Sequence, residues 1–188
     1  MNERPLCVDL FCGLGGWAEG FLREGYRVVG FDNDPRFAKV YPGEFVLQDV
    51  RTLDGRRFRD ARCIVASPPC QEFSSLRWMF RRQPWGLHTF PRTDLWSDAE
   101  RIAREARVPI VIENVEGARK WVGPARTHRG SFYLWGDVPL LSPMALPPKE
   151  GRLRARHGWS DRRRGPDGAA LRAKIPLPLA RAVARGFL

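Results

Sequence analysis

The sequence has no long apolar run. No stretch of its 188 residues approaches the length of about 18 uncharged apolar residues that marks a membrane-spanning helix, although 43% of the residues are hydrophobic. The first residues, MNERPLCVDLFCG, lack the basic start and the small-residue cleavage site of a signal peptide. We therefore expect an intracellular, cytoplasmic protein with no membrane association. The length suits one domain, 1–188, and the chain shows no internal repeat.

Cysteine is scarce, and its spacing excludes two common uses. The four cysteines are Cys7, Cys12, Cys63 and Cys70, with no C-x-x-C pair and no Cys/His spacing typical of zinc. We expect no metal. Three of them lie in or beside apolar, strand-like runs, which is typical of buried, reduced thiols. Cys70 differs because it directly follows two prolines at the end of such a run.

Acidic residues are too few to balance the basic ones. The chain has 32 Lys and Arg against 21 Asp and Glu, a formal net charge of +11 and a pI near 10.5. A surplus of this size favours a polyanionic partner, since each neutralised phosphate releases counterions. We expect nucleic acid, with a generally arginine-rich composition as the alternative.

Apolar runs alternate with amphipathic segments through the first two thirds of the chain. The runs predicted to be strands are 5–11, 26–34, 44–50, 62–69 and 108–115, and the segments predicted to be helical are 17–25, 35–41 and 93–107. This alternation predicts an α/β fold with a doubly wound, mostly parallel sheet. Such sheets bind ligands at the carboxyl ends of their strands.

The pattern changes after Gly117. Residues 118–141 are turn-rich and predict a β segment with a hairpin, whereas 147–168 are polar, basic and rich in helix breakers, as in a mobile loop or arm. The chain closes with an amphipathic helix in 175–188, with Pro176 or Pro178 in its first turn.

A glycine-rich turn and two acidic strand ends predict a cofactor pocket. Gly13, Gly15 and Gly16 lie between the first strand and the first helix, where glycine lets the backbone approach a ligand. Tight turns also use glycine for geometry alone, but the second strand ends in GFDND, where a carboxylate can bind a ribose diol. Asp49 ends the third strand. Together these features indicate an adenosine-bearing cofactor.

Cys70 and Glu113 follow the fourth and fifth strands and should meet at the same edge of the sheet. A nucleophile and an acid at one ligand crevice suit covalent catalysis. Taken alone, each is more often structural. The segment 74–92 that follows combines arginines with aromatic residues, which suits phosphate contacts with base stacking; a solvated basic loop is the alternative.

These residues together resemble the DNA (cytosine-5) methyltransferases. The segments VDLFCGLGGW, GFDNDP, QDV, SPPCQEFS and IENVEG occur in that family's order over residues 6–117, and 172–184 resemble its last motif. The resemblance implies a Rossmann-like methyltransferase fold that uses S-adenosylmethionine and releases S-adenosylhomocysteine. It implies a core in 1–117, a reduced target-recognition region and basic loop in 118–170, and a helix in 171–188 that returns to the core.

The resemblance also assigns residues to roles. Cys70 would be the nucleophile, with Glu113 and Arg129 at the target base. The cofactor-binding residues would be Asp9, Phe11, Gly13, Leu14, Gly16, Asp32, Asn33, Asp49, Val50 and Pro68. The nucleic-acid contacts would be Gln71, Ser74, Arg77, Arg81, Arg82 and Arg126.

The implied function is methyl transfer to C5 of cytosine in DNA, duplex rather than single-stranded, through a covalent Cys70–C6 intermediate. Two departures matter. Ser131 stands where the family has a second arginine, and only about fifty residues separate IENVEG from the last motif, which predicts short, relaxed or borrowed sequence specificity. The alternatives are an inactive or partner-dependent DNA-binding relative, or an enzyme acting on tRNA or single-stranded nucleic acid. We expect a monomer, and the small size suggests a viral or mobile-element gene.

Overall fold

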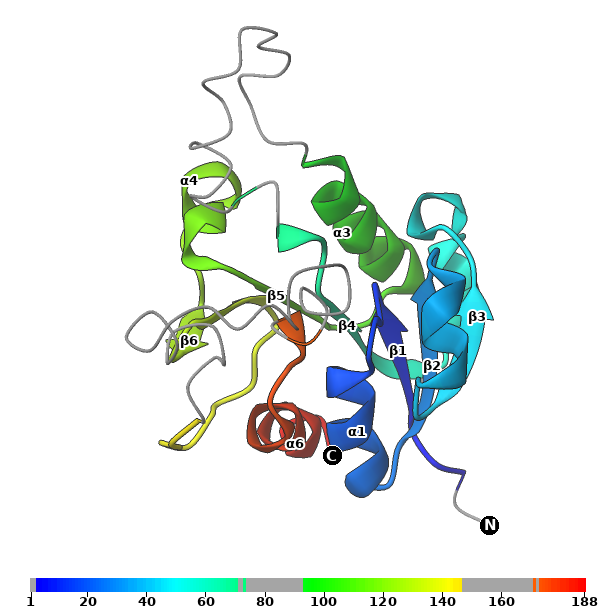
Figure 1. Cartoon of the computed structure of the whole chain (residues 1–188), viewed down its shortest axis with the longest axis horizontal. Coiled ribbons are helices and arrows are strands. Elements are labelled where there is room, and N and C mark those ends of the chain that lie inside the picture. The colour runs from blue at the N-terminus through cyan, green and yellow to red at the C-terminus, as the bar shows by residue number, and fades with distance from the viewer. Residues whose placement is uncertain (1–2, 71–72, 74–92, 147–170, 172) are drawn as a thin grey trace, which may run out of the picture.

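Seven strands form one sheet, in the order β3-β2-β1-β4-β5-β7-β6 (Figure 1). The structure, a computed structural model, describes residues 3–70, 73, 93–146, 171 and 173–188. The strands are β1 (Leu6–Leu10), β2 (Arg27–Asp32), β3 (Glu44–Leu47), β4 (Ala61–Ala66), β5 (Ile110–Asn114), β6 (Thr127–Arg129) and β7 (Phe132–Gly136). The first five run parallel, and β7 runs antiparallel to both β5 and β6. The predicted α/β fold with a mostly parallel sheet is confirmed.

Helices cover both faces of the sheet because successive strand residues point to opposite sides. The α-helices are α1 (Gly16–Arg23), α3 (Asp94–Ala106), α4 (Arg119–Val122) and α6 (Leu177–Arg185). Short 3-10 helices are η1 (Pro35–Lys39), η2 (Val50–Thr52), η3 (Gly55–Phe58) and η5 (Glu116–Ala118). Buried side chains separate into a core beneath α1 and α6 and a second core beneath α3. None of the helices in these described ranges is long and apolar enough to cross a membrane.

The C-terminal helix α6 lies against α1, as Figure 1 shows. Gly20 permits this approach, since a Cβ there would lie 2.3 Å from the Cβ of Ala180. The Tyr26 hydroxyl donates to the carbonyl of Ala184 at 3.0 Å. At the edge of the contact, Glu24 accepts from Arg181 at 2.5 Å and from Arg185 at 2.9 Å. The last segment of the chain is therefore fixed to the first helix.

Two predicted elements differ from the structure. The segment 35–41 forms only the short η1, because Tyr41 turns inward and becomes a buried part of the core. Residues 118–122 are helical and not β, since the spacing of one helical turn lets Ala118, Trp121 and Val122 all pack on the core beneath α3. The predicted hairpin forms from β6 and β7.

Candidate active site

The candidate site lies at the carboxyl ends of β1 and β4. These neighbouring strands are the point where the order reverses: the chain winds from β1 outward to β2 and β3, then returns to β4 and continues to β5 on the other side. The loops that leave such a switch point diverge and open a crevice. Here the two loops are the glycine-rich turn after β1 and the Pro-Pro-Cys turn after β4.

A cavity of about 290 Å³ opens at this edge. Six of its lining residues were predicted to bind the cofactor: Phe11, Asp32, Asn33, Asp49, Val50 and Pro68. Six more were not predicted: Arg51, Pro69, Phe73, Asp94, Leu95 and Trp96. Three of these, Asp94 to Trp96, form the first turn of α3, whose closeness to the other lining residues depends on the tertiary fold. The predicted residues Asp9, Gly13, Leu14 and Gly16 are not among the lining residues.

Asp32 joins the glycine-rich turn to the end of β2. Its Oδ2 accepts from the backbone N–H of Gly13 at 3.0 Å, and its Oδ1 accepts from that of Asp34 at 3.0 Å. Burial raises the pKa of Asp32, while these backbone N–H groups oppose the rise. A carboxylate held in this orientation on the cavity wall is suited to accept hydrogen bonds from a diol.

The glycines of this turn also serve the packing. Gly13 and Gly15 have φ of 48° and 72°, in the left-handed region that glycine tolerates. A Cβ at Gly16 would lie 2.4 Å from the backbone nitrogen of Ile175, so the segment before α6 passes directly over the start of α1. Gly16 therefore has a structural reason to be glycine.

Two further aspartates differ in their surroundings. Asp49 accepts from the backbone N–H and the Nε of Arg51, both at 3.0 Å, and this side-chain contact lowers the pKa of Asp49. Asp9 is 1% exposed and accepts from the Tyr41 hydroxyl at 3.0 Å, and burial raises its pKa well above the ordinary value. Asp49 thus lines the cavity as an ion pair, whereas Asp9 belongs to the core.

Cys70 and Glu113 lie at the same edge of the sheet. Cys70 follows β4 and is half-buried, and Glu113 in β5 is 6% exposed. Because β4 and β5 are parallel neighbours, with Ala66 opposite Ile112, their carboxyl ends lie together. The Nδ2 of the buried Asn114 donates to the carbonyl of Pro68 at 2.9 Å, which ties the end of β5 to the Pro-Pro-Cys turn.

Phe73 fixes the chain just after Cys70. Its backbone N–H donates to the carbonyl of Cys70 at 3.0 Å, and its buried ring packs edge-on against Trp96, with centroids 6.4 Å apart. A Cβ at Gly117 would lie 2.1 Å from the Phe73 carbonyl oxygen. The glycine of IENVEG therefore makes room for this segment, a role that no sequence pattern revealed.

The structure places Arg129 in β6, where it bonds to two residues of the same strand and to Leu141, beyond the end of β7. Its Nη1 donates to Thr127 Oγ1 at 3.0 Å and to the carbonyl of His128 at 2.9 Å, and its Nη2 donates to the carbonyl of Leu141 at 2.7 Å. Arg126 is exposed just before β6. The other predicted nucleic-acid contacts, Gln71, Ser74, Arg77, Arg81 and Arg82, and the segment 147–168, lie outside the described residues.

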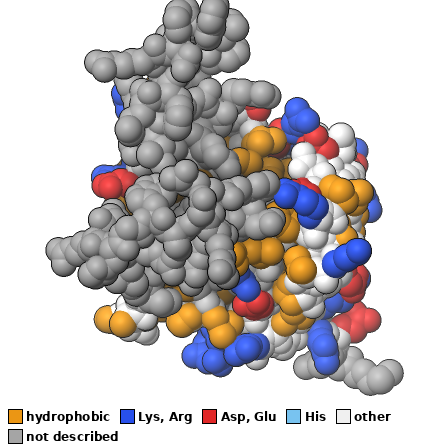
Figure 2. Space-filling view, viewed as in Figure 1, with side chains coloured by type: hydrophobic (Ala, Val, Ile, Leu, Met, Phe, Trp, Pro, Cys, Tyr) orange, Lys and Arg blue, Asp and Glu red, His pale blue; other side chains and the backbone are white. Residues whose placement is uncertain are grey.

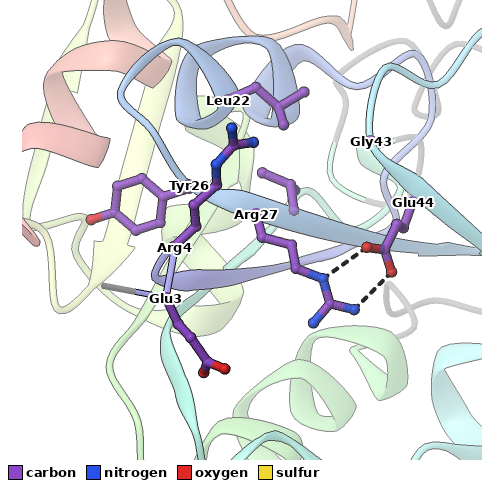
Figure 3. Close-up of a pocket in the computed structure, with 8 residues that line it drawn as sticks. Glu3, Arg4, Leu22, Tyr26, Arg27, Gly43 and Glu44 are labelled. Carbon is purple, nitrogen blue, oxygen red and sulfur yellow. Dashed lines mark hydrogen bonds and ion pairs between the residues drawn. The ribbon is translucent and has the colours of Figure 1, made fainter. Parts of the chain in front are cut away.

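A larger cavity of about 580 Å³ lies near the amino ends of β1 and β2 (Figure 3), and none of the predicted site residues lines it. Its walls carry both signs of charge, and the Arg27 guanidinium binds Glu44 through two hydrogen bonds of 2.7 and 2.9 Å. Its wall therefore combines opposite charges, two of which are already paired with each other, and does not favour one kind of ligand. Among the described residues no three His, Cys, Asp or Glu side chains group together as metal ligands do.

The sheet and the cavity at its switch point define an α/β protein of the Rossmann-like methyltransferase fold. Residues 6–121 match the family model described as C-5 cytosine-specific DNA methylase. The chain belongs to this family.

Several relatives are similar to this chain over more than half of its length. The type II methylase M.HgiDII of Herpetosiphon aurantiacus is 31% identical over 124 residues, which cover 60% of this chain and 33% of the relative. The type II methyltransferase M.HgiGI of the same organism is 30% identical over 123 residues, 60% of this chain and 91% of the relative. The Dnmt2 methyltransferase of S. pombe aligns with a TM-score of 0.44 and 20% identity, covering 63% of this chain and 36% of that one. The chain thus spans about a third of M.HgiDII.

Proposed function

We propose that the protein transfers a methyl group from S-adenosylmethionine to C5 of cytosine in DNA, with Cys70 as the nucleophile. The observation that carries this proposal is the arrangement at the switch point: the turn bearing Cys70 and the strand bearing Glu113 end beside a cavity whose wall includes Asp32. The family to which the chain belongs supports the same reaction.

The cavity suits the adenosine part of the cofactor. Phe11, Val50 and Pro68 supply apolar wall for a flat ring, and the oriented carboxylate of Asp32 supplies the acceptor for a ribose diol. Asn33 and Asp49 line the same space and would contact the adenine edge. When bound, S-adenosylmethionine supplies an electrophilic methyl group.

Cys70 and Glu113 would act on the base. The Cys70 thiolate adds to C6 of cytosine and forms an S–C6 bond, while Glu113 hydrogen-bonds N3 and stabilises the charge that develops on the ring. The electron pair displaced from the C5–C6 double bond makes C5 nucleophilic, so that C5 would take the methyl group while the bond from that methyl to the sulfonium sulfur breaks and S-adenosylhomocysteine leaves with the electron pair. Loss of the C5 proton to water then restores the double bond and expels Cys70 as thiolate. Cysteine suits both steps, since it is a strong nucleophile and a good leaving group.

In a duplex the target base must first leave the stack, at a cost of about a few kcal/mol. The segment after Cys70, with Gln71, Ser74, Arg77, Arg81 and Arg82, is proposed to contact the DNA during this step. Short or relaxed sequence specificity remains part of the proposal, because only about fifty residues are available for recognition between IENVEG and the last motif.

The test is transfer of tritiated methyl from the cofactor to C5 of cytosine in duplex DNA. We expect label in wild-type reactions and none with Cys70→Ala, while Cys63→Ala, which removes a buried thiol, keeps the activity. Label-free product from the wild type on every cytosine-containing DNA contradicts the proposal.

A second candidate is an inactive or partner-dependent relative that binds DNA without modifying it. The observation in its favour is that Ser131 replaces the second arginine, while Arg129 donates to the carbonyl groups of His128 and Leu141. Oligonucleotides with 5-fluorocytosine separate the two, because only an active Cys70 with a methyl donor leaves a stable covalent adduct. The same trap offered as duplex, single strand and RNA identifies the substrate.

A further inference from the structure

The Pro-Pro-Cys turn has few hydrogen-bond donors of its own. Pro68 and Pro69 have no backbone N–H, so neither residue before Cys70 donates a hydrogen bond. The turn is held instead from neighbouring elements: Ser67 N–H donates to the carbonyl of Leu10 at 3.2 Å, and the Asn114 side chain donates to the carbonyl of Pro68. In addition to the contact from Phe73, the position of Cys70 therefore depends on groups outside its own loop.

A third contact reaches this turn from α1. The Nε1–H of Trp17 donates to the Oγ of Ser67 at 3.0 Å, across 50 residues of sequence. Trp17 is only 2% exposed, and a buried indole N–H usually finds such an acceptor. The bond joins the start of the helix that follows the glycine-rich turn to the turn that carries the nucleophile.

Trp17 is itself held firmly. It is the second residue of α1, directly after Gly16, where the backbone of Ile175 leaves no space for even a Cβ. Its ring packs edge-on against Phe21, with centroids 6.4 Å apart. Because the indole has little freedom to move, Ser67 has a fixed partner.

We propose that Trp17 is a positioning residue, which through Ser67 keeps the Pro-Pro-Cys turn in register with the glycine-rich cofactor turn. This inference rests on the proposed function. The methyl donor would be bound beside one turn and the nucleophile beside the other, and a misplacement of about 1 Å between reacting groups costs as much as a hundredfold in rate. The hydrogen bond sets that separation without touching either reactant.

The test compares Trp17→Phe and Ser67→Ala with the wild type in single-turnover methyl transfer to duplex DNA. Each variant removes the bond, and we expect a rate about tenfold lower, which corresponds to about 1.4 kcal/mol and lies within the usual contribution of one hydrogen bond. Cofactor affinity, measured by calorimetry, should stay unchanged. The double variant should be no slower than Trp17→Phe alone, and Ser67→Thr, which keeps the hydroxyl, should keep the rate.

Tyr26→Phe is the matched control, since it removes a buried hydrogen bond of the same 3.0 Å length that holds α6 and does not touch the turn. It should lower the melting temperature and leave the transfer rate unchanged. If Trp17→Phe and Ser67→Ala lose stability but keep the rate, or if their loss follows weakened cofactor binding, the positioning role is wrong while the proposed function stands. A wild type that transfers no methyl contradicts the proposed function and the positioning role together.

Discussion

Asp32 shows how the environment of one side chain sets its properties. Both of its oxygens accept backbone hydrogen bonds, from Gly13 and Asp34, yet burial still raises its pKa. Asp34, two residues later, accepts hydrogen bonds from the side chain and the backbone N–H of Arg36, and these contacts lower the pKa of Asp34. The pKa values of the two carboxyl groups are therefore shifted in opposite directions from the ordinary aspartate value of about 3.9.

Asp32→Asn should weaken cofactor binding by about tenfold or more at neutral pH, because a hydrogen bond to a charged group contributes about 1.5–3 kcal/mol. In the wild type, affinity should fall as pH falls through the raised pKa of Asp32, since the protonated carboxyl is a poorer acceptor. Calorimetry across pH checks this: the Asp32→Asn profile should lack that fall, and Asp34→Asn should keep the wild-type profile. An Asp32→Asn profile that keeps this fall, or an Asp34→Asn profile that loses it, contradicts the role of Asp32 in cofactor binding. For folding the sign is opposite, because a raised pKa contributes stability at low pH that is lost as pH rises through it.

Arg129 has a predicted role that differs from the contacts of its side chain. The family resemblance predicts a catalytic arginine, whereas the structure shows its guanidinium bonded to Thr127, His128 and Leu141. Arg129→Met should lower the free energy of unfolding by about 1–3 kcal/mol, because three acceptors, two of them in part-buried contacts, lose a charged donor.

Urea denaturation and single-turnover transfer, measured together, separate the two roles of Arg129. The exposed Arg126→Met serves as the control for loss of one charge near the same strand. A lost rate with unchanged stability would support the catalytic assignment and contradict the structural one.

At the scale of elements, the contact between α1 and α6 joins the first and last helices of the chain. It depends on small residues, since the Cβ and backbone of Ala180 come within 2.7 Å of where a Gly20 Cβ would lie. The ion pairs of Glu24 with Arg181 and Arg185 lie at its edge. The packing of α1 against α6 therefore depends more on the close approach of their backbones than on large side chains.

Gly20→Ala should destabilise the protein although alanine favours helices. Overpacking costs about 1–3 kcal/mol, which exceeds the gain of about 1 kcal/mol from helix propensity. The midpoint of urea denaturation measures the loss. Ala180→Gly in the same chain should restore part of it, because the nearest atom is removed, and Arg23→Ala on the same helix should have little effect. A Gly20→Ala protein as stable as the wild type would show that the helices separate without cost.

At the scale of the whole molecule, much of the positive charge on the described residues is locally balanced. The same ion pair occurs at the start of three 3-10 helices, where the capping aspartate binds the arginine two residues later: Asp34 with Arg36, Asp49 with Arg51, and Asp54 with Arg56. Figure 2 shows basic side chains spread over the described part of one face, with acidic ones among them. The described residues hold 20 Lys and Arg against 17 Asp and Glu, so most of the net charge of +11 belongs to the segments outside them.

DNA affinity should therefore depend on particular arginines and not on the total charge. Arg81→Gln with Arg82→Gln should lower affinity and reduce the slope of log K against log salt by about 2, since each phosphate contact contributes about 0.9. Arg36→Gln with Arg56→Gln removes the same charge from paired positions and should change the slope little. Fluorescence anisotropy over a salt series measures both. Equal slopes for the two double variants would mean that net charge alone governs binding.

The sequence by itself determined the succession of strands and helices, the glycine-rich turn, and the positions of Asp32, Cys70 and Glu113 at strand ends. These features follow from apolar periodicity and turn residues, which act over a few neighbours. Only the tertiary structure decided which groups hold them: Ser67 meets Trp17 across 50 residues, Pro68 meets Asn114 across 46, and Tyr26 meets Ala184 across 158. It also brought Phe73 against Gly117 and Arg129 within hydrogen-bond distance of the Leu141 carbonyl. Such pairings depend on strand order and helix packing, which no local pattern of residues specifies.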